Sequence, residues 1–453
     1  MRTILLPAAA LLIALPACAE VSPQQQLEQR YERALAAGYK ALMMCGAMAH
    51  SQAQGAARTD RHVTQWELTG IYPALDPIIR TLPHTVVREA GQIVRVEVEW
   101  SDDMPARFAT YSRDTGCAVQ PIGMEIPARS TVPLPTPTVV TPDISEIVEP
   151  DEALAPVIAT AFDGTFGEHS RTTAVVVRQD GEIIAESYAD GFGPNTPQRT
   201  WSVAKSIAAT IVGTFQQGGI IDVNQSAGIG ESEDDPRRAI TIDQLLRMSS
   251  GRSSDTPGNR TDPMYWGGAS VTERAGDWPL VHPPGTVFRY ANNDTLMALA
   301  PLDPFKDEPG FDGLFQTLGM NATVAERDWQ GDHMLSSQVW STARDLSLLG
   351  QLHAQDGVWE GERILPEGWV DYVSSPTGPQ PESAYGYGAS WWLMRGMEGI
   401  PDDTFAARGN RGQFVVVVPS RNVVIVRRGE DLAGMGGFDL EAFTRDVLAA
   451  MED

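Results

Sequence analysis

The sequence has little cysteine and little positive charge, and each shortage excludes a class of protein. Its 453 residues include three cysteines, and 59 acidic residues outnumber 34 basic ones, which leaves a net charge of −25. Nucleic-acid binding needs clustered lysine and arginine, so a chain this acidic is not expected to bind DNA or RNA. We interpret the negative charge as a source of solubility. The chain also lacks a metal-ligand spacing and a phosphate loop, so neither a metal nor a cofactor is predicted.

Long apolar runs are scarce too, and the one candidate lies at the N-terminus. Residues 4–15 are apolar but too few for a good membrane span. A basic start before them and small residues after them predict a signal peptide of residues 1–19. Residues 15–18 also resemble a bacterial lipobox, which would make the signal 1–17 and would anchor the protein to the membrane through a lipid on Cys18. Both alternatives predict an exported, periplasmic protein, either soluble or lipid-anchored.

The remaining two cysteines, Cys45 and Cys117, predict a disulfide. Removal or acylation of Cys18 leaves an even pair in an oxidising compartment. The disulfide would close a loop of some seventy residues, and the chain-entropy model gives such a loop a stabilisation of roughly 4 kcal/mol. Two buried free thiols are the alternative.

Length and composition divide the chain into two domains and a linker. Residues 20–120 are predicted to form a small α+β domain, because apolar residues recur at near-helical spacing over 27–42 and valines alternate with charged residues over 94–100. Prolines crowd residues 121–150, which predicts an extended linker. The second domain then covers residues 151–453.

Hairpin signals stand at both ends of the second domain. The strand patterns at 172–178 and 182–188 flank an Asp-Gly turn, and those at 413–418 and 422–428 flank a Pro-Ser turn. The segments between are mainly helical, and a helix over 439–451 closes the chain. We therefore predict the α+β class, with an antiparallel sheet built from both ends of the domain, flanking helices and an α-helical region.

A serine and a lysine lie three residues apart in the run Arg199-Thr200-Trp201-Ser202-Val203-Ala204-Lys205. On a helix the two side chains share a face, roughly 5–6 Å apart at Cβ, so a neutral lysine amine can take the proton of the hydroxyl. Apolar spacing over 207–215 indicates that helix, and two glycines end it. Ser202 would then stand at the helix N-terminus, where the dipole favours an oxyanion. Taken alone, the pattern also fits an ordinary helix start with a solvated lysine.

Two further elements offer chemistry that suits such a nucleophile. Tyr290-x-Asn292, expected on a loop, supplies a phenol and an amide, and a nearby ammonium could lower the pKa of the phenol. Residues 406–413, just before or at the start of a strand, contain Gly409, which lets the backbone approach a substrate, and Asn410, whose N–H could donate to an oxyanion. Each element also has a purely structural alternative, namely a core tyrosine with a turn asparagine and a glycine-containing hairpin entry.

Taken in order, Ser202-x-x-Lys205, Tyr290-x-Asn292 and the Gly409 element resemble the serine β-lactamase and penicillin-binding-protein superfamily. The resemblance is closer to the class C-like branch that includes 6-aminohexanoate-dimer hydrolase and related esterases. It extends over residues 165–450 and implies a β-lactamase/transpeptidase-like fold. Further stretches that carry it are 245–251, 284–290, 318–320, 341–346 and 357–369.

The resemblance implies a role for each residue. Ser202 would be the acylated nucleophile, and Lys205 would be the neutral amine that activates it. Tyr290 would pass the proton to the leaving group. Asn292 would hold Lys205 and the substrate. The N–H groups of Ser202 and Asn410 would form the oxyanion hole.

The third element departs from the family pattern. The β-lactam and peptide binders of the family carry Lys-Thr-Gly or His-x-Gly there, whose cation helps to hold a substrate carboxylate. This chain has Ala407-Arg408-Gly409, and the 6-aminohexanoate-dimer hydrolase branch departs from the pattern similarly. Alternation along a strand predicts that Arg408 points away from the side that Ala407 faces, so Arg408 is not an obvious substitute. Arg411 is a candidate to compensate. The loss argues against efficient β-lactamase or D-Ala-D-Ala carboxypeptidase activity.

The sequence therefore predicts an exported serine hydrolase whose partner is a small-molecule amide or ester, with its oligomeric state left open. The alternatives are a β-lactamase or D-Ala-D-Ala peptidase, and a non-catalytic penicillin-binding-like envelope protein. The intact set of Ser202, Lys205 and Tyr290 favours an enzyme.

Overall fold

The computed structural model describes residues 21–126, 146–253, 262–307 and 310–452. The expected signal segment and Cys18 lie outside these residues, as does most of the proline-rich stretch. The proposed domain boundaries stay predictions, whereas the secondary structure and its packing can be compared directly with the sequence patterns.

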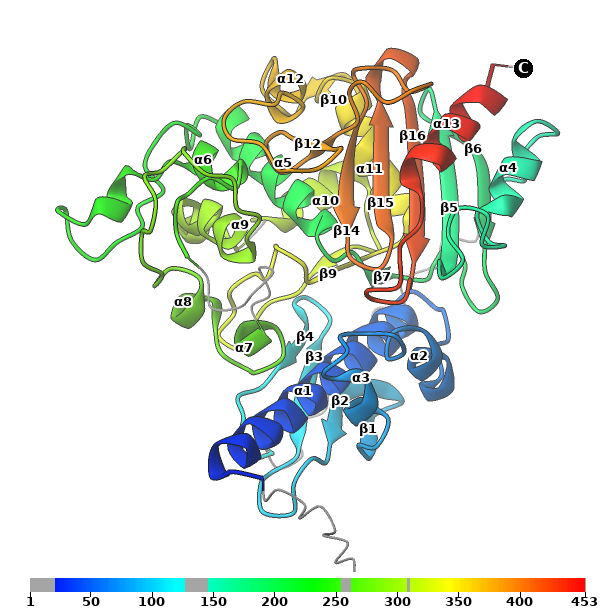
Figure 1. The fold of residues 1–453 in the computed structure, drawn as a ribbon. Coiled ribbons are helices and arrows are strands. Elements are labelled where there is room, and N and C mark those ends of the chain that lie inside the picture. The colour runs from blue at the N-terminus through cyan, green and yellow to red at the C-terminus, as the bar shows by residue number, and fades with distance from the viewer. Residues whose placement is uncertain (1–20, 127–145, 254–261, 308–309, 453) are drawn as a thin grey trace, which may run out of the picture.

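The N-terminal unit is a long helix packed on a small antiparallel sheet (Figure 1). The helix, α1 (Pro23–Ala53), begins at Ser22, which forms a capping box with Gln25. The Cys45–Cys117 disulfide joins it to the last strand of the sheet and confirms the predicted pairing. The other elements of this unit are α2 (Asp60–Trp66), α3 (Asp76–Ile79), β1 (His84–Glu89), β2 (Gln92–Val98), β3 (Arg107–Ser112) and β4 (Gly116–Val119).

A seven-stranded sheet organises the rest of the chain, in the order β12-β13-β14-β15-β16-β5-β6. The two predicted hairpins, β5–β6 and β15–β16, are both present, and β16 pairs with β5, so the ends of the domain meet in one sheet as predicted. The strands are β5 (Thr172–Gln179), β6 (Glu182–Tyr188), β12 (Gly386–Tyr387), β13 (Trp392–Leu393), β14 (Phe405–Gly409), β15 (Gln413–Val418) and β16 (Val423–Gly429).

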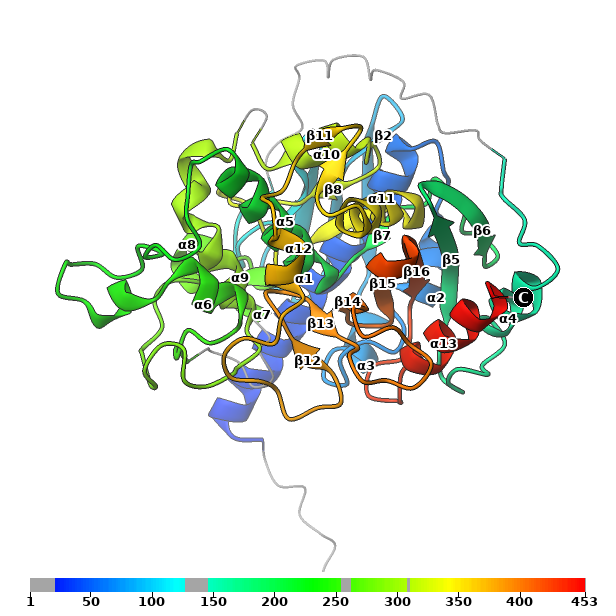
Figure 2. The same ribbon diagram turned by 90° about the horizontal axis from the view of Figure 1, so that it is seen from above.

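Helices cover both faces of this sheet, which explains why its central strands are apolar on both sides (Figure 2). Val415 and Val417 pack toward α5 (Val203–Gln217) and α11 (Ala343–Ala354). Val416 and Val418 pack toward α4 (Leu154–Thr160) and α13 (Leu440–Ala450) on the other face. The predicted α+β class is therefore confirmed.

A mainly helical region lies beside the first of these faces (Figure 1). It holds α6 (Ile242–Leu246), α7 (Asp262–Tyr265), α8 (Val271–Arg274), α9 (Asn292–Ala298), α10 (Asp312–Leu318) and α12 (Trp369–Val373), with the 3₁₀ turns η1 (Pro236–Ala239) and η3 (Ala300–Phe305). Two small sheets lie apart from the large one. The first has the order β7-β9-β8 and the second pairs β10 with β11. Their strands are β7 (Gln198–Arg199), β8 (Val324–Ala325), β9 (Val339–Ser341), β10 (Val358–Trp359) and β11 (Glu362–Arg363). A 3₁₀ turn, η4 (Pro419–Arg421), joins β15 to β16. No helix among the described residues combines the length and apolar character needed to cross a membrane.

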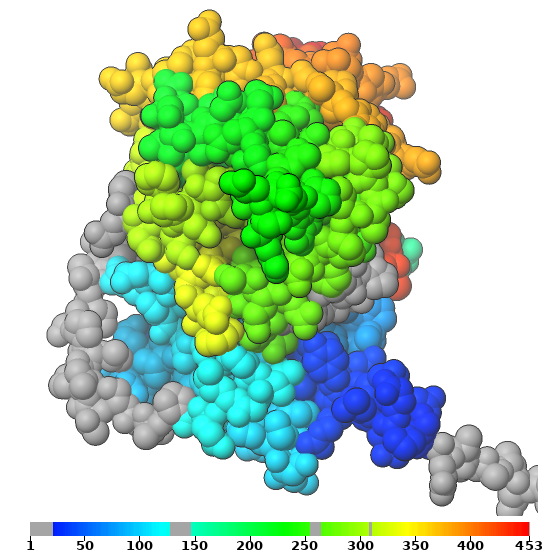
Figure 3. All heavy atoms as spheres, turned by 90° about the vertical axis from the view of Figure 1, so that its left-hand side faces the viewer, coloured from blue at the N-terminus to red at the C-terminus, as the bar shows by residue number. Residues whose placement is uncertain are grey.

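The N-terminal unit packs closely against the rest of the molecule (Figure 3). Buried residues of α1 and the small sheet share one hydrophobic cluster with Trp201, Trp266 and Trp340. Two glycines of α1 permit this contact, because a β-carbon on Gly38 would overlap the carbonyl oxygen of Trp266 and one on Gly46 would overlap the ring of Trp340.

Candidate active site

Ser202 stands at the N-terminus of α5, as the sequence predicts. It is the N-cap residue of a fifteen-residue helix that ends at Gly218, and its side chain is half-buried. The residue before it, Trp201, has a φ of 51°, which is a strained value for a bulky side chain. The ring of Trp201 is buried in the cluster shared with the N-terminal unit, so packing holds this backbone and fixes the direction of Ser202.

Lys205 lies one helical turn along and has three polar neighbours. Its Nζ is 3.1 Å from Ser202 Oγ, 2.5 Å from Asn292 Oδ1 and 2.8 Å from the carbonyl oxygen of Ser336. The amide and carbonyl oxygens can only accept, so they take the two N–H groups of a neutral amine. The remaining lone pair then faces Ser202 Oγ, whose hydroxyl can donate to it. The arrangement thus fits an amine that removes the serine proton.

The surroundings of Lys205 favour this neutral form. Burial lowers the pKa of the Lys205 ammonium well below its ordinary value, and the positive charge of Arg199 lowers it further. Arg199 is itself buried, with its guanidinium 3.8 Å from the centre of the Trp201 ring and hydrogen bonds to Ser337. A lysine with a lowered pKa is the general base that such a nucleophile needs near neutral pH.

We expect the acylation rate to rise with pH through the pKa of Lys205, because only the neutral amine accepts the serine proton. Removing the charge of Arg199 should raise that pKa, so Arg199→Met should move the rising limb of the profile to higher pH. Arg199→Lys keeps a positive charge and should leave the limb near its original place. A pH profile of kcat/KM on one ester substrate for the three proteins measures both effects. If the rising limb of Arg199→Met stayed at its original pH, Arg199 would not be lowering the pKa of Lys205.

Tyr290 and Asn292 both reach the same site from one short segment. Tyr290 precedes α9 and hydrogen-bonds Ser202, and its ring centre lies 4.9 Å from Lys205 Nζ. Asn292 is the first residue of α9 rather than a loop residue, because the chain turns into the helix directly after Ala291. The expected lowering of the phenol pKa is wrong: burial raises the pKa of Tyr290 well above its ordinary value. Tyr290 therefore stays protonated and can donate.

The Gly409 element lies just before a strand, β15, as predicted, and it also forms the end of the preceding strand, β14. Gly409 is the last residue of β14, and Asn410 to Gly412 form the turn into β15. A β-carbon on Gly409 would overlap the carbonyl oxygen of Thr200 and lie 3.1 Å from the amide nitrogen of Ser202. Only glycine lets this strand end lie against the start of α5, which brings the backbone after Gly409 beside the N–H of Ser202.

The prediction for Arg408 needs correction. Ala407 and Arg408 do point to opposite sides, but Ala407 is buried in the core and Arg408 lines the pocket that contains Ser202. The guanidinium stacks on Tyr385 at 3.7 Å, and it forms no hydrogen bond or ion pair with any described residue. Arg411 cannot compensate, because it is buried with its Nε 2.8 Å from Glu430 Oε2.

These elements enclose a cavity of about 530 Å³. Of the two adjacent tryptophans in the sequence, Trp391 is a core residue and Trp392 faces the pocket. Arginines line the cavity, and no aspartate or glutamate of the described chain does, although the protein as a whole is strongly acidic. The lining consists of Tyr72, Arg199, Trp201, Ser202, Tyr265, Trp266, Tyr290, Asn292, Ser337, Trp392, Arg408, Gly409, Asn410, Arg411 and Phe414.

Sequence reasoning missed three contributors to this site. Arg199 lies in the same run of sequence as Ser202 and Lys205, and this proximity in the sequence could have indicated that its charge affects Lys205. Ser336 acts through its carbonyl oxygen, which leaves no trace in a side-chain pattern. Tyr72 belongs to the N-terminal unit, for which the sequence indicates no catalytic group.

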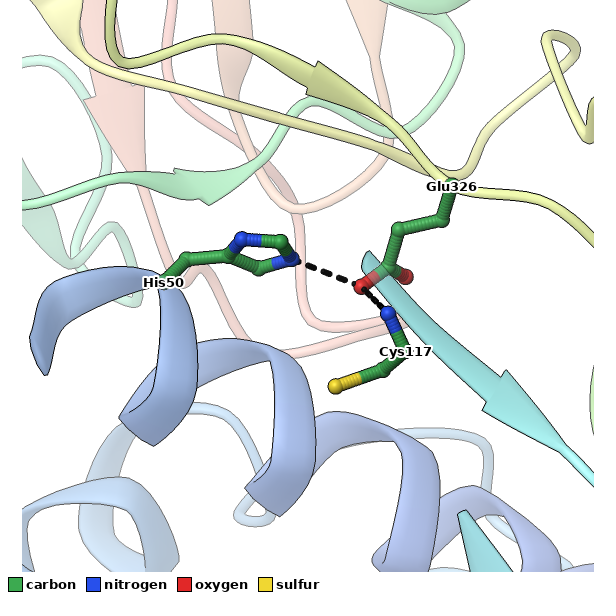
Figure 4. Close-up of side chains that lie close together, drawn as sticks. All are labelled: His50, Cys117 and Glu326. Atoms are coloured by element: carbon green, nitrogen blue, oxygen red, sulfur yellow. Dashed lines mark hydrogen bonds and ion pairs between the residues drawn. The ribbon is translucent and has the colours of Figure 1, made fainter. Parts of the chain in front are cut away.

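A second polar cluster, His50, Cys117 and Glu326, joins the N-terminal unit to the main body (Figure 4). Glu326 Oε1 lies 2.8 Å from His50 Nε2 and accepts a hydrogen bond from the N–H of Cys117. Its other oxygen accepts from Gln338. The sulfur of Cys117 is bonded to Cys45, so it does not offer a thiolate to a metal. We interpret the cluster as a buried contact between the two parts of the molecule.

Comparison with known proteins supports the resemblance seen in the sequence. Residues 158–302 match the Beta-lactamase family. A 6-aminohexanoate-dimer hydrolase from Paenarthrobacter ureafaciens is 25% identical over 292 residues, which are 57% of this chain and 73% of that protein.

Two solved structures share the fold. A provisionally named 6-aminohexanoate-dimer hydrolase from Bacillus anthracis has a TM-score of 0.53 and 20% identity over 65% of this chain and 82% of its own. A family VIII carboxylesterase has a TM-score of 0.51 and 16% identity over 67% of this chain and 99% of its own. At these identities the two structures establish the fold alone, and the family match over residues 158–302 shows that the chain is similar to the Beta-lactamase family in that part.

Proposed function

We propose that the protein is an exported hydrolase that cleaves a small amide or ester through an acyl-enzyme on Ser202. The observation that carries this proposal is the environment of Lys205. Two fixed acceptors hold its amine at 3.1 Å from Ser202 Oγ, and burial disfavours its protonated form.

The first half of the reaction forms the acyl-enzyme. Ser202 Oγ attacks the carbonyl carbon and its proton passes to Lys205 Nζ, while the N–H groups of Ser202 and Asn410 stabilise the oxyanion. The bond to the leaving amine or alcohol then breaks. Tyr290 gives its proton to the leaving group and recovers one from Lys205. In the second half, water attacks the carbonyl carbon of the acyl ester and gives up a proton through the same groups. The bond to Ser202 Oγ then breaks, Oγ takes a proton back, and the acid is released.

The test uses a fluorophosphonate probe with mass spectrometry of the labelled peptide, together with turnover of three substrates. These are a short p-nitrophenyl ester, a linear 6-aminohexanoate dimer and a chromogenic cephalosporin. We expect a single adduct on Ser202 and turnover of the ester, the dimer or both. Absence of both labelling and turnover would refute the proposal.

Arg408 supports a second candidate, an enzyme that acts on β-lactams or D-Ala-D-Ala peptides. Its guanidinium has no hydrogen bond or ion pair within the described part of the chain. It lies in the pocket and could hold a substrate carboxylate, which is the function that the Lys-Thr-Gly cation has in the family. Turnover of the cephalosporin faster than of the ester would favour this candidate.

Export rests on the apolar N-terminal segment and agrees with the disulfide, because disulfides persist in oxidising compartments. Fractionation of the native host with mass spectrometry of the mature N-terminus would separate cleavage after residue 19 from a lipid on Cys18. A cytoplasmic, unprocessed chain would contradict both alternatives.

A further inference from the structure

The N-terminal unit contributes a ring to the pocket that contains Ser202. Tyr72, which follows α2 in the chain, lines this pocket together with residues of the main body. It is half-buried, as are Tyr290 and Trp392, whereas the other aromatic lining residues are almost fully buried. The rings that offer surface to a ligand therefore come from both parts of the molecule.

Tyr72 is connected to the nucleophile through a chain of aromatic contacts. Its ring centre lies 5.3 Å from that of Trp266 at 40°, and 6.2 Å from that of Trp201 at 77°. Trp201 directly precedes Ser202. These separations and angles are those of interacting aromatic pairs, so the wall near Ser202 has defined ring orientations.

The backbone around Tyr72 is held firmly against the main body. Arg411, in the turn after Gly409, donates hydrogen bonds to the carbonyl oxygens of Trp66 and Thr69. The N–H of Ala433 donates to the carbonyl of Gly70. Asp76 then accepts from the N–H groups of Gly70 and Ile71. The turn that precedes Tyr72 is thus fixed to the same hairpin that supplies Asn410.

Trp266 is fixed just as closely from the N-terminal side. Arg107, which is fully buried, donates to its carbonyl oxygen, and Gly38 of α1 leaves the space for that carbonyl. An aromatic wall that is positioned in advance loses little entropy when a flat group packs against it.

We propose that this wall is a subsite for an aromatic ring of the substrate, and that the N-terminal unit sets the preference for that ring through Tyr72. A ring can stack on Tyr72 or meet it edge to face, whereas a saturated ring of the same size offers apolar area alone. The inference rests on the proposed function in one respect, that Ser202 is the nucleophile beside the subsite.

The first experiment compares matched esters whose leaving groups and acyl groups differ only in aromaticity. One pair is methyl 3-phenylpropanoate and methyl 3-cyclohexylpropanoate, and the other is benzyl acetate and cyclohexylmethyl acetate. In at least one pair we expect kcat/KM to favour the phenyl compound by about threefold to tenfold. Tyr72→Leu should abolish this preference and Tyr72→Phe should keep it.

Two features keep the comparison specific. The ratio of two substrates on one protein is independent of the fraction that is folded. Tyr31→Leu removes another tyrosine of the N-terminal unit, one that is 42% exposed and outside the pocket, and should leave the ratio unchanged. An equal ratio in the unmodified protein and in Tyr72→Leu would overturn the proposal.

A binding measurement separates failure of the subsite from failure of the proposed function. Ser202→Ala is titrated by calorimetry with the same esters, alone and combined with Tyr72→Leu. Tighter binding of a phenyl ester that is lost with Tyr72→Leu supports the subsite even if no ester is turned over. Equal binding of the phenyl and cyclohexyl compounds overturns the subsite even if Ser202 proves to be the nucleophile.

Discussion

Lys205→Ala should slow acylation of Ser202 by about a thousandfold or more. The substitution removes the amine whose lone pair faces Ser202 Oγ at 3.1 Å, and no other described side chain combines that position with a lowered pKa. The raised pKa of Tyr290 makes it a poor base in its place. The measurement is the rate of fluorophosphonate labelling, followed by mass spectrometry of the intact protein.

Two controls separate the chemical role of Lys205 from a structural one. Lys306→Ala removes a lysine that pairs with Asp332 outside the pocket, and should leave labelling unchanged. A small primary amine added to Lys205→Ala should restore part of the labelling rate, more so at higher pH, because only its neutral form accepts the proton. Unchanged labelling in Lys205→Ala would remove the lysine from the mechanism.

Gly409→Ala should lower kcat/KM about a hundredfold. The new β-carbon would overlap the carbonyl oxygen of Thr200 and lie 3.1 Å from the nitrogen of Ser202. Both neighbours are backbone atoms, so either the end of β14 or the start of α5 must move. The movement separates the N–H groups of Ser202 and Asn410, which must meet one oxyanion. Steady-state kinetics on the best ester measures the loss.

The matched control for this substitution is Gly193→Ala. A β-carbon on Gly193 meets no atom within 4 Å, so activity and thermal stability should stay at their original values. If Gly409→Ala proved as active as the unmodified protein, the proposed oxyanion hole would be in a different place.

The structural predictions from the sequence were correct where they depend on a local pattern of residues. The Ser202 helix, both hairpins of the large sheet and the Cys45–Cys117 pair all follow from periodicity, turn residues or cysteine parity. The ordered motifs also predicted that Tyr290 and Asn292 lie near Ser202 and Lys205, and the structure places them in contact with these residues. Periodicity is local because backbone geometry repeats every two or 3.6 residues, whatever the rest of the chain does.

Predictions failed where distant parts of the chain decide the outcome. The direction of the Tyr290 pKa shift depends on burial by segments far away in the sequence, and burial outweighs the hydrogen bond to Ser202 and the charge of Arg408. Strand alternation placed Ala407 and Arg408 on opposite sides, but which side is the core depends on where the helices pack.

By itself, the sequence determined which reactive groups the chain offers: a serine and a lysine three residues apart, a tyrosine, an asparagine and a glycine-containing segment, in an order that predicts acyl transfer. The tertiary structure alone decided which groups surround that chemistry. It placed Arg408 in the pocket, Arg199 near Lys205 and Tyr72 of the N-terminal unit in the wall of the cavity. The physical reason is that the hydrogen-bonding and reactive groups of a side chain are fixed by its residue type. The burial of a side chain, the electrostatic potential around it and the shape of the cavity arise only when remote segments pack together.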